Sequence, residues 1–355
     1  MKLSEQVYFY KGDSGNLEKS FSHLYRGIGS SNFLVVKDGE QLMIDSGFLD
    51  GPHRKRVASE LLADGIDINA TGTVIFSHSH PDHIQSASRF ARSLGMRFAM
   101  HHDSELFVRS ERFHFEAYYN YPDSVRREIM ILPEFLVKLA FKLLGFGFRA
   151  MQIHYFFHHS SVFRFCGGIH VVSLPGHCLG HAGFHIPSHR LFYAADLVFD
   201  SKSRFGLMPC LNNALSSLPR ALDDLERVKA LDIEVFVPGH GELILGREAI
   251  HQFLDTAREN IDRLIAEILL HVVNSFGLTL TQVFRCLFGR VGLGLYVHLA
   301  PLVYQTLHHL AAIGRISCGN RGRIIVWMSN RADSNRTVAW PEPVAELAQT
   351  GPLPL

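Results

Sequence analysis

The sequence predicts an α/β fold followed by a helical C-terminal region, and two observations support this prediction. In the N-terminal third, apolar strand-like segments alternate with amphipathic helix-like segments, which is the order typical of α/β proteins. From about residue 247 the pattern becomes mainly helical. The chain has 355 residues, of which 47% are hydrophobic and 19% charged. It is therefore long enough for about two domains and too apolar for a disordered protein.

The N-terminal third predicts a hairpin and two helix–strand pairs. Residues 32–47 read as two strands around an Asp38-Gly39 turn, a strong hairpin signal. Residues 53–65 then predict an amphipathic helix, and residues 71–78 a strand that runs into a histidine-rich segment. Residues 86–95 predict a second helix, and residues 96–102 the strand that follows it.

The remaining elements divide the chain into a first domain over residues 1–246, a module over residues 247–330 and a proline-containing tail over residues 331–355. An aromatic, helical insert over residues 103–160 interrupts the first domain, and short strands follow it. The module reads as helices and then a hairpin over residues 315–328 with Gly319–Gly322 at its tip. One of the helices begins at a threonine cap, and another, over residues 300–314, ends at Gly314. This order is typical of a winged helix.

Charge and cysteine usage exclude several classes of protein. Lys+Arg 35 against Asp+Glu 34 leaves no overall field that would attract nucleic acid or an anionic membrane. The five cysteines are odd in number and form no CxxC pair, which fits a reducing compartment. The N-terminus lacks the apolar core of a signal peptide, and Glu134, Lys138 and Lys142 interrupt the most apolar stretch. We therefore expect a soluble, cytoplasmic protein.

The first histidine motif follows the apolar strand 71–76. It places His78, His80, Asp82 and His83 within six residues. On an extended chain His78 and His80 point the same way, while Asp82 and His83 can turn to a neighbouring position after Pro81. A solvated histidine-rich loop is the alternative, but three imidazoles and a carboxylate at a strand end favour metal binding. One loop thus offers ligands to two metals.

Three further motifs follow apolar strands downstream. They contain His177 within Pro175–His181, Asp196 after Tyr193-Ala194-Ala195, and His240 within Val237–Gly241. A glycine precedes each of the two histidines and lets the backbone turn and approach closely. Asp45 also ends a predicted strand.

Together these five motifs, in this order, resemble those of the metallo-β-lactamase-fold superfamily. The resemblance covers roughly residues 25–245 apart from the insert, and it implies an αββα sandwich with metals at the rim of its two sheets. It implies that His78, His80 and His177 bind one metal, that Asp82, His83 and His240 bind the other, and that Asp196 bridges the pair. Asp45 would orient the metal loop.

Two residues near His177 are not among the metal ligands that the resemblance implies. His181 matches a recurrent histidine that is not a ligand. Cys178 departs from the pattern, because the family usually has a small hydroxyl residue there. It is either a redox-sensitive thiol beside a ligand or a small buried apolar residue, and the second interpretation is favoured.

The resemblance also implies hydrolytic chemistry. The donor set, imidazole and carboxylate without thiolate, suits two Zn²⁺ per chain and also admits Fe or Mn. A hydroxide bridging the metals would attack an ester, thioester, lactone, amide or phosphodiester, with Asp82 orienting it. We expect a dinuclear hydrolase acting on a small, lipophilic ester or thioester. The alternatives are an endoribonuclease using the same metals and a mononuclear iron persulfide dioxygenase. An exported β-lactamase and a vestigial binding module are less favoured.

Two regions bear on substrate and partners. The insert has an apolar face, which would pack as ordinary core, cover a pocket for an acyl substrate as a lid, or rest on a membrane surface. His154, His158 and His159 in the insert read as surface or hydrogen-bonded residues. The module would pack on the catalytic domain or form a homodimer. Its arginines would alternatively bind RNA phosphates, although the near-neutral chain disfavours this; they are Arg285, Arg290, Arg315, Arg321 and Arg323.

Overall fold

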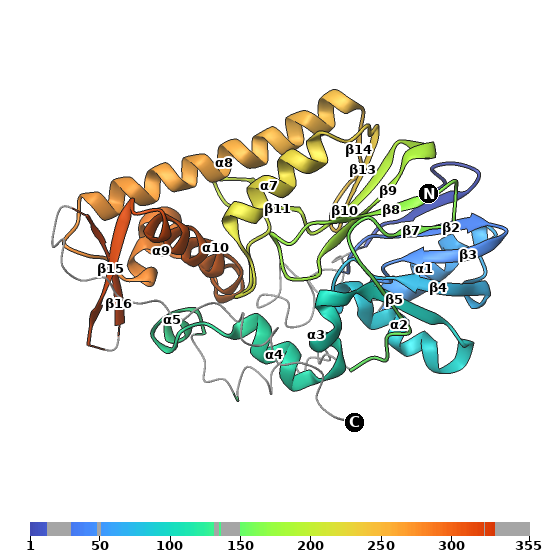
Figure 1. Ribbon diagram of the computed structural model, residues 1–355, viewed down its shortest axis with the longest axis horizontal. Helices are drawn as coiled ribbons and strands as arrows, with labels where there is room; N and C mark the ends of the chain where they lie inside the picture. The colour runs from blue at the N-terminus through green and yellow to red at the C-terminus, as the bar shows by residue number, and fades with distance from the viewer. Residues whose placement is uncertain (13–29, 48–50, 131–134, 136–149, 323, 331–355) are drawn as a thin grey trace.

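Two six-stranded β-sheets pack face to face and carry helices on their outer sides (Figure 1). The computed structural model describes residues 1–12, 30–47, 51–130, 135, 150–322 and 324–330. Within these residues, no helix is both long enough and apolar enough to cross a membrane.

The first sheet has its strands in chain order. They are β1 (Val7–Tyr10), β2 (Phe33–Asp38), β3 (Glu40–Ile44), β4 (Thr71–Ile75), β5 (Arg97–His101) and β6 (Tyr155–Phe157). The first three are antiparallel, and β3 to β6 are parallel. The predicted hairpin is confirmed: β2 and β3 turn at Asp38-Gly39, where Gly39 has a φ of 73°. The parallel strands bring the residues after β4, β5 and β6 to the same sheet edge.

The second sheet has the strand order β14-β13-β10-β9-β8-β7. Its strands are β7 (Val162–Phe163), β8 (Ile169–Ser173), β9 (Ala182–Ile186), β10 (Leu191–Ala195), β13 (Val235–Pro238) and β14 (Ile244–Leu245). Only β10 and β13 pair in parallel, so these two strands end side by side. A separate two-stranded ribbon, β11 (Val198–Asp200) and β12 (Leu207–Pro209), follows β10.

Three apolar layers hold the sandwich together. The layer between the sheets contains side chains such as Leu34, Ile44, Phe184 and Tyr193. On the first sheet, α1 (Gly51–Ala63) and α2 (Pro81–Leu94) form the outer layer. On the second sheet, α7 (Leu218–Lys229) and the N-terminal half of α8 (Arg247–Val273) do so. The predicted helix–sheet–sheet–helix arrangement is therefore present.

Helix α2 begins five residues earlier than the sequence predicts. It starts at Pro81 instead of Ser86, and proline is favoured at the first helical position because its missing N–H has no partner there. Asp82 and His83 therefore lie in the first turn of a helix, while His78 and His80 precede it.

The described part of the insert forms α3 (Glu105–Arg109), α4 (Glu111–Tyr119) and α5 (Asp123–Ile129). Helix α5 packs into one core with the C-terminal helices through Val125 and Ile129. The Tyr296 hydroxyl also donates to the Glu128 carbonyl at 2.8 Å. This part of the insert is thus ordinary core. The predicted amphipathic face at Glu134, Lys138 and Lys142 lies outside the described residues.

The C-terminal region comprises the end of α8, then α9 (Leu280–Phe288), α10 (Leu293–Ala312), β15 (Ile316–Arg321) and β16 (Ile324–Ser329). Thr279 caps α9, as predicted, through a capping box with Gln282. Helix α10 begins earlier than predicted and contains Pro301. The predicted hairpin tip was wrong: Gly319 is paired with Val326 inside the ribbon, so the turn is shorter.

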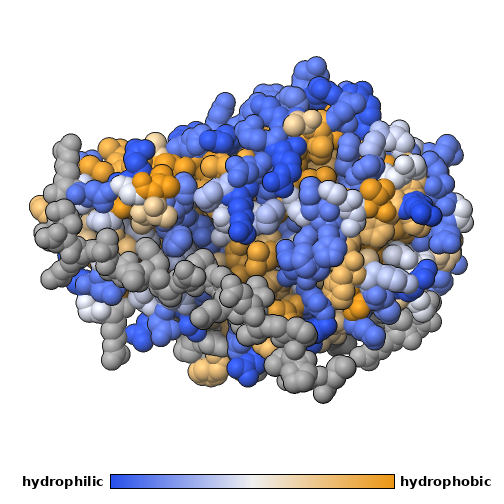
Figure 2. Space-filling model, viewed as in Figure 1, coloured by the Kyte–Doolittle hydropathy of each residue, from blue (hydrophilic) through white to orange (hydrophobic). Residues whose placement is uncertain are grey.

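Apolar side chains are exposed where α8 ends and on the hairpin. Figure 2 shows hydrophobic surface at this end of the molecule. The exposed residues there include Leu270, Val273, Phe276 and Ile324, and Phe276 is 98% exposed.

Candidate metal centre

All seven predicted ligands lie close together at one edge of the sandwich. His78 and His80 follow β4 of the first sheet, and Asp82 and His83 open α2. From the second sheet come His177 after β8, Asp196 after β10 and His240 after β13. Because parallel strands end at the same edge, the fold brings segments more than 150 residues apart into one cluster.

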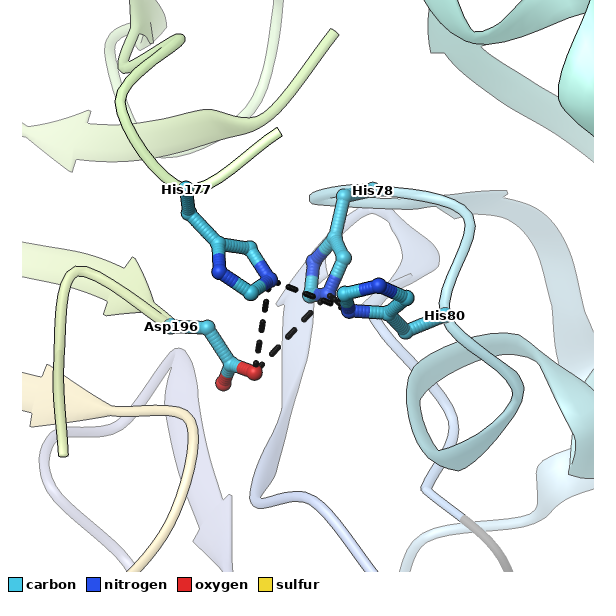
Figure 3. Close-up of side chains that lie close together, drawn as sticks. All are labelled: His78, His80, His177 and Asp196. Atoms are coloured by element: carbon cyan, nitrogen blue, oxygen red, sulfur yellow. Dashed lines mark hydrogen bonds and ion pairs between the residues drawn. The ribbon is translucent and has the colours of Figure 1, made fainter. Parts of the chain in front are cut away.

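One group consists of His78, His80, His177 and Asp196, whose donor atoms lie within 4.8 Å of one another. Figure 3 shows these side chains converging on one point. His80 Nδ1 is 2.8 Å from His78 Nε2 and 3.0 Å from His177 Nε2. Asp196 Oδ2 is 3.7 Å from His177 Nε2 and 3.9 Å from His78 Nε2. Three imidazoles and a carboxylate form a donor set suited to a transition metal.

The second group consists of Asp82, His83, Asp196 and His240, again with donor atoms within 4.8 Å. His240 Nε2 is 3.1 Å from Asp82 Oδ2 and 3.6 Å from Asp196 Oδ1. His83 Nε2 is 3.2 Å from Asp196 Oδ1. Asp196 therefore presents Oδ2 to the first group and Oδ1 to the second. A carboxylate shared in this way is suited to bridging two cations.

The hydrogen bonds of the imidazoles test whether these groups fit metal ions. His177 Nδ1 donates to the Cys210 carbonyl at 2.9 Å, and His83 Nδ1 lies 2.6 Å from Asp45 Oδ2. In a neutral ring each Nε2 is then an acceptor with its lone pair aimed into the cluster. His83 Nε2 and Asp196 Oδ1 are buried and have no hydrogen-bond partner among the described residues. A metal cation would satisfy both of these buried atoms, so the residues fit metal ions.

Asp45 belongs to neither donor group, but it hydrogen-bonds residues that position the ligands. It is fully buried with a φ of 58°, a strained conformation for a residue with a side chain. Its carboxylate accepts from the Ser77 N–H at 2.7 Å, the Ser77 hydroxyl at 2.6 Å and the Tyr193 hydroxyl at 2.7 Å, besides its contact with His83. These bonds fix the start of the histidine loop and the orientation of the His83 ring.

Two glycines allow the close backbone approach that the sequence predicts. A Cβ atom at Gly239 would lie 2.3 Å from Asp196 Oδ1. A Cβ at Gly176 would lie 2.3 Å from the Cα of Ala221 on α7. Neither position has room for a side chain, so both loops depend on glycine.

The electrostatics differ between the two groups. Burial, together with the neighbouring imidazoles, holds the pKa of His78 and of His80 well below the ordinary value. These rings are therefore neutral near pH 7, the form that binds metals. Burial opposes charge on His83 as well, but the carboxylates of Asp196, Asp45 and Asp82 raise its pKa overall. The second group is thus the more strongly anionic of the two.

Cys178 and His181 stand outside both groups. Cys178 is fully buried and packs with Phe107 and Tyr118, and burial raises the pKa of its thiol. It therefore has the surroundings of a small apolar residue. His181 Nδ1 donates to the Leu174 carbonyl at 2.9 Å.

Residues of the insert and of the C-terminal helices also make contacts near the cluster, and the sequence motifs do not predict these contacts. The Tyr118 hydroxyl hydrogen-bonds the Ser79 hydroxyl, and its ring centroid lies 4.5 Å from that of His80. From α10, His298 packs its ring against Phe199, with centroids 4.9 Å apart. Burial lowers the pKa of His298 to about 4, and the charge of Asp196 acts on it in the opposite direction. The aromatic composition of the insert was the only sequence signal for any of these contacts.

Comparisons with known proteins bear on the family and the fold of the chain. The family model described as the metallo-beta-lactamase superfamily matches residues 25–240. A metallo-beta-lactamase family protein from Thermus thermophilus is similar in structure, with a TM-score of 0.68 and 19% identity over 92% of this chain and 100% of that chain. A beta-lactamase domain protein from Burkholderia ambifaria has a TM-score of 0.66 and 15% identity over 92% of this chain and 94% of that chain. No curated protein gives a significant match.

Proposed function

Because the chain belongs to the metallo-beta-lactamase superfamily, whose members are generally metal-dependent hydrolases, we propose that it is a dinuclear hydrolase of an ester or thioester. The observation that carries this proposal is the division of the Asp196 carboxylate between two donor groups. Oδ2 faces the imidazoles of His78 and His177, and Oδ1 faces His83 and His240. A mononuclear iron dioxygenase would need only the first group, so the second group supports hydrolysis.

The proposed ligands are those that the motifs predict. His78, His80 and His177 would hold one metal, Asp82, His83 and His240 would hold the other, and Asp196 would be shared by the two. The absence of thiolate favours Zn²⁺, two per chain, and also admits Fe or Mn. Bound there, the metals supply Lewis acidity and lower the pKa of a coordinated water towards ~7.

The exposure of the ligands supports a direction of substrate approach. The His240 side chain is 35% exposed and that of Asp82 14%, whereas the side chains of His78 and His83 are fully buried. His80 is also partly exposed, so the substrate reaches the cluster from the side of His80, Asp82 and His240. Asp82 is positioned to orient the attacking water there and to accept its proton.

The surroundings of the cluster support a lipophilic or acyl substrate. The Tyr118 ring covers one side of His80, and Phe199 and His298 lie on the side of the C-terminal helices. The His298 imidazole is suited to donating a hydrogen bond to a polar group of the substrate. Apolar walls with a few polar groups are typical of pockets for small organic ligands.

The C-terminal region has a structural role in the same proposal. Helices α9 and α10 with the hairpin β15–β16 form a winged-helix-like module, and α10 supports the loop that carries His177. Homodimer formation, RNA binding by the arginines and contact with a membrane surface stay predictions. Arg323 of the arginine set lies outside the described residues.

Elemental analysis of the purified protein, with thioester and phosphodiester assays on the same sample, tests the proposal. About two metal ions per chain with thioester turnover is the expected result. One iron per chain, or cleavage of single-stranded RNA alone, would contradict it. His80→Ala should remove turnover and lower the metal content, whereas the exposed His170→Ala on β8 should change neither.

A further inference from the structure

A second cluster of metal-binding side chains lies along the same sheet edge, outside the site described above. Strands β5 and β6 are parallel, and His101 pairs with Phe157 at their carboxyl ends. The next residues, His102 and His158, therefore emerge side by side. Their ring centroids are 4.2 Å apart, and both side chains are exposed.

A carboxylate completes this cluster. Asp103 Oδ1 is 2.8 Å from His102 Nε2, and Asp103 Oδ2 is 3.6 Å from His101 Nδ1. The donor atoms of His101, His102 and Asp103 all lie within 4.8 Å of one another. His158 is not a member of this group, and it joins the cluster through its ring contact with His102. Two ligands of one tetrahedral Zn²⁺ are about 3.4 Å apart, so these spacings are close to those of a coordinated ion.

His101 differs from the other members of the cluster because its side chain is buried. It is 5% exposed; its Nε2 lies 3.0 Å from the Ser173 hydroxyl, and its Nδ1 accepts the Asp103 N–H at 3.3 Å. Both ring nitrogens are thus engaged, and the ring anchors the backbone of Asp103. The His102 and Asp103 side chains are 47% and 44% exposed, so they can adjust to an ion that approaches from solvent.

We propose that His102, Asp103 and His158 bind a further divalent transition-metal cation of the Zn²⁺ class, with His101 positioning Asp103. Two imidazoles and one carboxylate are donors that select Zn²⁺, Ni²⁺ or Cu²⁺ over Mg²⁺ and Ca²⁺. Solvent completes the coordination because the cluster is open, and binding is weaker than at the buried centre. This site goes beyond the proposed hydrolase and does not depend on it.

The test compares Zn²⁺ binding by the full chain and its variants after removal of metal with a chelator. Equilibrium dialysis at micromolar free Zn²⁺ with elemental analysis should give one equivalent more for the wild type than for the double variant His102→Ala/His158→Ala. Asp103→Asn, which preserves size, should weaken this equivalent at least ~10-fold. His170→Ala, another exposed histidine, is the matched control and should bind as the wild type does.

The difference between wild type and double variant does not depend on how many ions the buried centre holds, so it distinguishes this proposal from the hydrolase proposal. Turnover by the double variant should equal that of the wild type. Equal Zn²⁺ content in the wild type, the double variant and Asp103→Asn would overturn the proposal. An extra equivalent of Zn²⁺ that binds only at millimolar free Zn²⁺ would be adventitious, and this result would also overturn the proposal.

Discussion

The side-chain amide of Gln305 on α10 donates a hydrogen bond of 3.2 Å to the backbone carbonyl of Asn213. Asn213 Nδ2 in turn donates to the His177 carbonyl at 3.1 Å, and the Ser216 hydroxyl donates to the same carbonyl at 2.7 Å. The C-terminal helices therefore hold, through one loop, the backbone of a proposed metal ligand.

Replacing Gln305 with leucine should weaken metal binding without unfolding the chain. The substitution keeps a similar volume but leaves the Asn213 carbonyl without this buried donor, and His177 loses part of its support. Interactions that orient ligands are worth about 10–100-fold in metal affinity. Competition with a chromophoric chelator measures the effect. Gln252→Leu, at an exposed glutamine of α8, is the control, and an equal loss in both variants would contradict the prediction.

Asp45→Asn should lower both stability and metal affinity. The carboxylate accepts from three donor groups of Ser77 and Tyr193 and contacts His83, whereas an amide nitrogen in place of either oxygen turns hydrogens of its own towards at least one of these donors. Leaving buried donors unsatisfied costs about 1–3 kcal/mol. Chemical denaturation with and without metal measures the two effects. Tyr193→Phe removes a single donor and should have the smaller effect; the reverse order would count against this role of Asp45.

Gly239→Ala should abolish turnover, because the new methyl group would collide with the carboxylate of Asp196, the proposed bridging ligand. Gly72→Ala on β4 is the control, since no atom lies within 4 Å of its added Cβ. Rates and metal content of both variants should be measured together. Full activity in Gly239→Ala would mean that Asp196 does not need its present position.

The stability of the protein should decrease as the pH rises towards neutrality because of Asp224. Burial raises the pKa of this carboxyl to about 7, although it accepts the Gly176 N–H at 2.7 Å. The folded chain then holds a proton that the unfolded chain releases near pH ~4, so stability is lost between these values. The loss is at most about 4 kcal/mol.

Unfolding by denaturant from pH 5 to pH 8 measures this dependence. Asp224→Asn carries no titrating proton and should flatten the profile, with its advantage over the wild type growing towards pH 8. Parallel profiles for the two proteins would exclude Asp224 as the cause.

The sequence predicted the seven candidate ligands and, through the resemblance, Asp45 behind them, but it did not indicate the contacts from the insert and the C-terminal helices that support them. The histidine and aspartate motifs are local and follow apolar strands, and their resemblance to the motifs of the superfamily predicts that they meet at the rim of the two sheets. The hairpin at Asp38-Gly39 and the cap at Thr279 are equally local signals. By contrast, the contact between Gln305 and Asn213 joins positions 92 residues apart, and no periodicity encodes it.

Predicted boundaries differ from the structure where a local rule has a competing interpretation. Pro81 predicts a loop, although proline is equally suited to the first turn of a helix. Pro301 predicts a position near the start of a helix, yet α10 continues through it because the helix is held by packing on its neighbours. At Gly319, pairing with β16 prevails over the turn preference of glycine.

Each of the two donor groups contains side chains from both sheets, so bound metal would also link the two sheets to each other. A pair of ions there would cross-link the edge of the sandwich, because it would connect the loop after β4 to the loops after β8, β10 and β13. Each ion that binds only the closed form adds about 2.7 kcal/mol when its free concentration is 100 times its Kd. The melting temperature would then report the metal supply of the surroundings, and a chelator would loosen the two sheets before it disturbed either one.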